Sequence, residues 1–83
     1  MSKELLRALD LLESGNWDGA HQIAQRDKTE MGSWMHAIIH VVEGDRGNAE
    51  YWYQQAGRSF PGMESLKREL AAIRSVLKQK AEA

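Results

Sequence analysis

A glycine turn between two helical segments decides the fold, and it lies within residues 30–56, EMGSWMHAIIHVVEGDRGNAEYWYQQA. Before the turn, apolar residues recur at the three- and four-residue spacing of a helix. At about 100° per residue they cover a wide arc, and the set comprises Met31, Trp34, Met35, Ile38, Ile39, Val41 and Val42. A helix this apolar is normally packed between neighbours. The sequence therefore predicts a central helix over residues 30–43, ended by a turn at Gly44.

The same turn occurs 29 residues earlier in the chain. At this shift Gly15 falls on Gly44, and Ala20 falls on Ala49. The leucine stripe of residues 5–12 falls on apolar positions of the central helix in the same way. Self-similarity at a fixed period is typical of stacked helical units that cannot bury their apolar faces alone. We therefore expect repeated helical hairpins.

The remaining segments also follow the helical period, and none alternates as a strand does. Helices are expected over residues 3–13, 17–26, 46–56 and 64–80. The last helix carries a single apolar stripe made of Met63, Leu66, Leu70, Ile73 and Leu77. The predicted fold is all-α, a single helical domain over residues 1–83. It comprises two repeat-like helix-turn-helix hairpins, residues 3–27 and 30–57, and a C-terminal capping helix, residues 63–80. The alternative role of the last helix is dimerisation.

Composition limits the classes of function. The 83 residues are 42% hydrophobic, carry a net charge of −1 and include no cysteine. A charge this small gives no basic field for nucleic acid, and no apolar run approaches the roughly 20 residues of a membrane span. The lack of cysteine excludes disulfides and thiolate metal sites and fits a reducing compartment. We expect a cytoplasmic protein that binds neither nucleic acid nor membrane.

The second hairpin resembles a tetratricopeptide repeat. The resemblance rests on Trp34, Gly44, Ala49, Tyr53, Ala56 and Pro61, and it extends over residues 3–61. The offset of 29 residues is shorter than the usual period of about 34. The resemblance implies stacked hairpins whose concave face binds peptides or partner helices. The pattern His-x3-His-x2-Glu-Gly-Asp-x2-Asn-Ala-x-Tyr-Trp-Tyr is also similar to that of small bacterial proteins, a likeness that implies no activity.

One group of side chains is capable of binding a metal. His36, His40 and Glu43 lie within about 60° of one another on a helix, and two imidazoles with a carboxylate suit zinc or a similar divalent ion. Helical geometry places this face opposite the apolar arc, so we expect it outside the core. The alternative is a solvated histidine pair. His21, on the preceding helix, could approach this face, but the sequence does not place it.

The sequence offers no catalytic constellation. It contains no phosphate-binding glycine loop, nucleophile motif or paired proton-transfer carboxylates. We therefore expect a non-enzymatic module for interaction or assembly, without a required cofactor, whose partner is an unidentified protein or peptide or a second copy of the chain. Met35 and Ile39, at one edge of the central helix, and the exposed Tyr51 are the expected interaction surface. The alternative function is metal or ligand binding at His36, His40 and Glu43.

Overall fold

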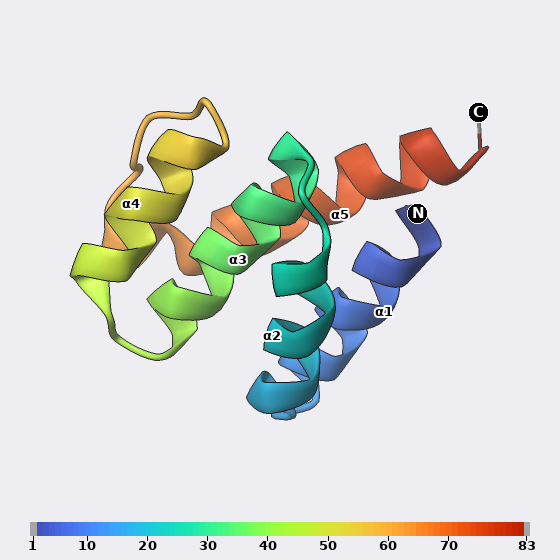
Figure 1. Ribbon diagram of the computed structural model, residues 1–83, viewed down its shortest axis with the longest axis horizontal. Helices are drawn as coiled ribbons and strands as arrows, with labels where there is room; N and C mark the ends of the chain where they lie inside the picture. Colours follow the sequence, from blue (N-terminus) through green and yellow to red (C-terminus); the bar gives the residue numbers. More distant parts are fainter. Residues whose placement is uncertain (1, 83) are drawn as a thin grey trace.

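Five α-helices make up residues 2–82, the part of the chain that the computed structural model describes (Figure 1). They are α1 (Ser2–Glu13), α2 (Trp17–Arg26), α3 (Glu30–Val42), α4 (Arg46–Gln55) and α5 (Leu66–Glu82), with a 3-10 turn, η1 (Met63–Ser65), before α5. These residues contain no strand, which confirms the prediction of an all-α fold. None of their helices has the combined length and apolar character that crossing a bilayer requires.

The two matching turns have the same geometry. Gly15 and Gly44 adopt positive φ angles of 92° and 77°, which glycine tolerates because it lacks a Cβ atom. At each turn, the backbone N–H of glycine and that of the next residue bond back to carbonyls of the helix that has just ended, which is the Schellman pattern. The next residue then caps the following helix. The side chains of Asn16 and Asp45 accept the backbone N–H three residues later, at 3.0 and 3.3 Å.

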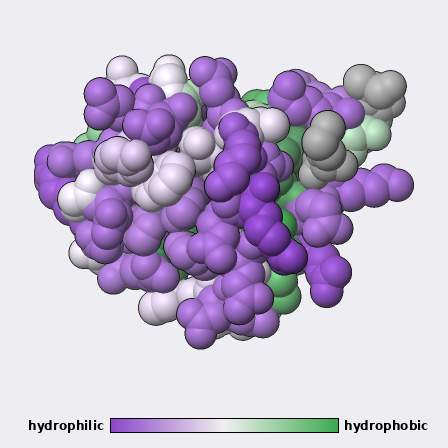
Figure 2. All heavy atoms as spheres, in the orientation of Figure 1, coloured by the Kyte–Doolittle hydropathy of each residue, from purple (hydrophilic) through white to green (hydrophobic). Residues whose placement is uncertain are grey.

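Helix α3 lies at the centre of the arrangement. It packs against α2 and α4, while α5 runs behind it in Figure 1 and packs against both α1 and α3. The core therefore has contributions from both sides of α3, and its largest fully buried side chains are Leu9, Trp34, Met35, Ile38, Ile39, Tyr53, Ile73 and Leu77. The face formed by α2, α3 and α4 is covered mainly by hydrophilic residues (Figure 2).

One carboxylate fastens α5 to the second pair of helices. The Oε1 atom of Glu69 accepts hydrogen bonds from the indole Nε1 of Trp34 at 3.0 Å and from the hydroxyl of Tyr53 at 2.7 Å. Burial, together with this hydrogen bond to Glu69, raises the pKa of Tyr53 far above its usual range. The hydroxyl therefore stays protonated at physiological pH and can donate to Glu69.

A second polar contact joins α5 to α1. Arg74 donates to Asp10 at 3.0 Å and to Glu13. Next to it, Ile73 and Leu77 of the apolar stripe are fully buried. The stripe therefore packs against α1 and α3 within the same chain.

Candidate metal centre

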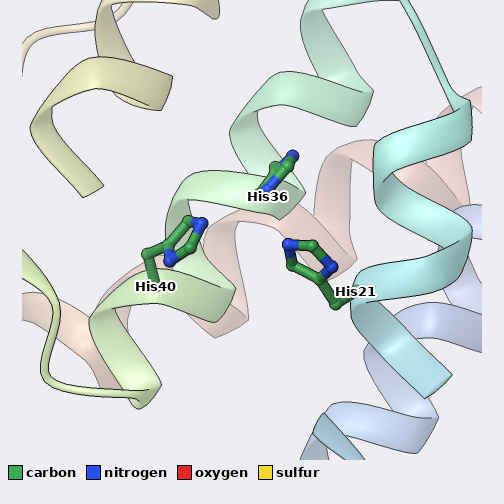
Figure 3. A group of neighbouring side chains, drawn as sticks. All are labelled: His21, His36 and His40. Atoms are coloured by element: carbon green, nitrogen blue, oxygen red, sulfur yellow. The ribbon is translucent and has the colours of Figure 1, made fainter. Parts of the chain in front are cut away.

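Three imidazoles from two helices meet at one point of the structure. His36 and His40 stand one turn apart on α3, and His21 reaches them from α2 (Figure 3). The rings of His36 and His40 are nearly parallel, with centroids 5.0 Å apart. The ring of His21 is edge-on to both, at 4.5 Å from His36 and 5.7 Å from His40. One nitrogen from each ring can be chosen so that all three lie within 4.8 Å of one another.

An aromatic side chain packs against one of the three imidazoles. Trp52 of α4 stacks on the ring of His36, with centroids 4.0 Å apart and planes inclined by 13°. His36 is consequently only 5% exposed. The expectation that the histidine face lies outside the core is therefore wrong for His36. The face is less apolar than the rest of α3, but α2 and α4 pack over it.

Burial sets the protonation state of His36. Loss of hydration, followed by repulsion from His21, His40 and Lys28, lowers the pKa of His36 to about 4. Its imidazole is therefore neutral at pH 7. Only the neutral form has a lone pair available for a metal ion, so binding at His36 requires no proton release at this pH.

Glu43 lies beside the imidazoles and not among them. Its Oε1 atom is 3.2 Å from Nδ1 of His40, and Asp45 Oδ2 is 3.8 Å from the same nitrogen. This Nδ1 is buried and makes no well-aligned hydrogen bond, although the Oε1 atom of Glu43 lies within hydrogen-bonding distance. Because Nδ1 faces the carboxylates, Nε2 is the nitrogen that would be free to bind a metal ion. A carboxylate behind a ligating histidine is the usual outer partner in metal sites, where it fixes the ring and raises its basicity.

Hydrogen bonds keep the second carboxylate ionised. The side chain of Asn48, and then its backbone N–H, donate to Asp45 and lower the pKa of its carboxyl group. The N-cap that starts α4 therefore also places a negative charge close to His40. Asp45 therefore both caps α4 and supplies negative charge beside the histidine cluster.

The donor set suits a borderline divalent ion. Zinc–imidazole bonds are about 2.0–2.1 Å long, so tetrahedral ligand nitrogens stand about 3.3 Å apart. The three nitrogens already fall within 4.8 Å, so shifts of less than about 1 Å in each side chain would bring them to that spacing. Nitrogen ligands without thiolates fit zinc, copper, nickel or cobalt, and do not fit calcium or magnesium.

The structure exposes one of the residues expected to form an interaction surface and buries the other two. Tyr51 is 52% exposed, as its position on the helix predicts. Met35 and Ile39 are fully buried, so assigning them to an exposed surface is wrong. They lie on α3, which packs against α5 in the same chain and has no free apolar edge at these two positions.

Two members of the cluster carry only weak signals in the sequence. His21 is separated from His36 by a link whose geometry the sequence does not determine, and Trp52 appears as an ordinary core aromatic. The only usable signal is chemical, because the chain has three histidines and all three enter the cluster. Comparison with protein-family models, curated proteins and solved structures finds no match to this chain.

Proposed function

We propose that this protein binds a divalent metal ion of the zinc class through His21, His36 and His40. The observation that carries the proposal is the convergence of three imidazole nitrogens within 4.8 Å, from two helices. Glu43 then acts as the outer carboxylate of His40 and not as a direct ligand. Bound metal would join α2 to α3 and so stabilise the folded chain.

Two features of the surroundings support the proposal. The buried His36 is neutral at pH 7, and the carboxylates near His40 offset part of the charge of a divalent cation. Burial of an uncompensated cation is costly, and nearby anions reduce that cost. The stacked Trp52 holds the ring of His36 in a fixed plane, which lowers the entropy lost when the ligand is ordered.

Isothermal titration with zinc, cobalt and nickel tests the proposal. We expect one ion per chain, with binding that weakens below about pH 6 as imidazole is protonated. Replacing His21 or His40 by Ala should reduce affinity at least tenfold, whereas Gln22→Ala, an exposed neighbour of His21, should leave it unchanged. Metal at 100 times its Kd should stabilise the wild type by about 2.7 kcal/mol. No binding heat and no thermal shift with any of these ions would refute the proposal.

The second candidate function is an interaction module for a protein or peptide. It is favoured by two large aromatic side chains at the surface, Trp17 at 44% and Tyr51 at 52% exposure. The matching turns at Gly15 and Gly44 support the repeat interpretation on which this function is based. Analytical ultracentrifugation of wild type and of Tyr51→Ala tests the homodimer version, which predicts self-association that the substitution weakens.

A further inference from the structure

We propose that a second site on this protein binds a free α-amino acid with an apolar side chain. The carboxylate of this small zwitterion pairs with Arg58, and its ammonium group pairs with Glu30. The site is the cavity between the start of α3, the end of α4 and the last turn of α5, here called the α3–α5 cavity. None of the three histidines lines it, so the site is separate from the proposed metal centre.

The size and lining of the α3–α5 cavity suit a small ligand. Its volume of about 310 Å³ is at the lower end of the range of small-molecule sites. The start of α3 and the end of α4, which form two of its sides, both lie at the top of Figure 1. Its apolar lining residues are Met31, Trp34 and Ala56, and its charged lining residues are Glu30, Arg58 and Lys80. A ligand with both an apolar part and charged groups matches this lining.

The guanidinium of Arg58 is held in place beside the cavity. Its Cζ atom lies 3.6 Å from the centroid of the Trp34 ring. That ring is itself fixed, because its Nε1 donates to Glu69 at 3.0 Å. A guanidinium stacked on an aromatic face keeps the N–H groups at its edge free, and these can form two parallel hydrogen bonds with a carboxylate. Arg58 is therefore a preorganised receptor for a carboxylate.

The carboxylate of Glu30 lies near Arg58 without pairing with it. Its Oε2 atom is 3.2 Å from the position that a Cβ atom on Gly57 would take, and Gly57 precedes Arg58 in the chain. Within residues 2–82, no carboxylate is at ion-pair distance from Arg58 or Lys80, and no cation is at that distance from Glu30. Opposite charges therefore line one cavity and stay unpaired, which leaves each of them available to a ligand.

These three charges together select a zwitterion. Glu30 repels a ligand that carries only a carboxylate, while Arg58 and Lys80 repel a ligand that carries only an ammonium group. A ligand with both groups can meet an opposite charge with each of them. Because two cations face one anion, we expect the carboxylate to contribute more to binding than the ammonium group. An apolar side chain on the same ligand can then lie against Met31 and Ala56.

Another cavity, of about 370 Å³ beside α2, is different in this respect. Three of its four charged side chains are already engaged within the chain. Arg26 and Lys28 donate to main-chain carbonyls of α2 at 3.0 and 3.3 Å, and Asp27 accepts from the backbone and hydroxyl of Thr29. The charged groups of the α3–α5 cavity have no such partners among the described residues, so they have more to gain from a ligand.

Titration of the full chain with L-leucine, followed by proton–nitrogen NMR spectra, tests the proposal. The indole N–H signal of Trp34 is the reporter, since this ring lines the cavity. No metal is added, because α-amino acids chelate zinc-class ions. L-Leucinamide lacks the carboxylate, N-acetyl-L-leucine lacks the ammonium group, and both retain the apolar side chain. We expect leucine to shift the signal with saturation, N-acetyl-leucine to bind about fivefold more weakly, and leucinamide to bind about tenfold more weakly or worse.

Variants then assign the charged groups. Glu30→Gln should remove most of the preference for leucine over N-acetyl-leucine, because the anion that attracts the ammonium group is lost. Arg58→Gln should weaken leucine binding about tenfold, and Arg58→Lys, which keeps the charge without the planar fork, should restore only part of it. Glu50→Gln is the matched control, since this carboxylate pairs with Arg46 on α4 and does not line the cavity. Circular dichroism checks that each variant is folded.

Several outcomes would overturn the proposal. The first is the lack of a saturable shift with leucine. Equal binding of leucine and either analogue to the wild type is the second, and this comparison does not depend on the stability of any variant. An unchanged preference for leucine in Glu30→Gln, or unchanged leucine affinity in Arg58→Gln, would also overturn it. Because the titration contains no metal, failure here leaves the metal proposal standing, and failure of the metal proposal leaves this site untouched.

Discussion

Lowering the pH should destabilise this protein through one buried imidazole. His36 has a pKa of about 4 in the folded chain, whereas an unfolded histidine titrates near 6.5. Between these values the unfolded chain binds more protons than the folded one, so the free energy of unfolding decreases as the pH falls. The contribution is intact above about pH 6.5 and is fully lost below about pH 4.

The size of the effect follows from the difference between the two pKa values. Each pKa unit corresponds to about 1.4 kcal/mol, so the full loss is about 3 kcal/mol, of which about 2 kcal/mol falls between pH 7 and 4.5. A domain of 83 residues is expected to have a total stability of about 4–12 kcal/mol. Protonation of His36 therefore removes a large fraction of it.

Urea unfolding followed by circular dichroism, in the presence of a chelator, measures this dependence. His36→Gln removes the titrating group and retains a polar side chain, so its stability should change about 2 kcal/mol less than that of wild type between pH 7 and 4.5. Comparing pH slopes separates this effect from any loss of baseline stability in the variant. Gln22→Ala, on the exposed face of α2, should retain the wild-type slope. Equal slopes for wild type and His36→Gln would refute the assignment of a neutral, buried His36.

Three further predictions concern the outer carboxylate, the turn and the last helix. Glu43→Gln should reduce zinc affinity about 10- to 100-fold in isothermal titration, whereas Glu50→Gln should not; equal affinities would remove Glu43 from the site. Gly44→Ala should lower the free energy of unfolding by about 1–2 kcal/mol because φ is 77° there. Gly47→Ala, within α4 and facing open space, should be neutral or stabilising. An unchanged melting temperature for Gly44→Ala would contradict the turn assignment. Deleting residues 62–83 should expose the apolar faces of α1 and α3. Gel filtration should then show aggregation, or circular dichroism should show partial unfolding. A soluble, equally stable fragment would contradict the capping role of α5.

The helices could be predicted from the sequence because their ends are determined locally. The expected segment 17–26 coincides with α2 (Trp17–Arg26), and the segment 30–43 exceeds α3 (Glu30–Val42) by one residue. A glycine with positive φ followed at once by a capping side chain needs no information from distant parts of the chain. The predicted ends of the C-terminal helix are the least accurate, since the structure begins it with the 3-10 turn η1 and continues it to Glu82.

The candidate site could be predicted only in part. The spacing of His36 and His40 places them on one helical face, but it does not show which other helix approaches that face. His21 and Trp52 arrive from α2 and α4 through packing between helices, which periodicity along one segment does not encode. For the same reason the sequence does not show that Met35 and Ile39 are covered within the chain, because the width of an apolar arc does not reveal how many neighbours it has.

The pairing of α1 with α5 has a consequence for how the chain acquires its structure. Arg74 and Asp10, which meet in this pair, are 64 positions apart in sequence. Each helical hairpin can form from near neighbours, yet the contact that completes the core requires a long loop to close. During synthesis α1 emerges early and has no α5 to pack against until almost all of these residues have been made. Hairpins formed from residues 3–57 should therefore remain loosely packed on the ribosome, and full cooperativity should appear in a single late step.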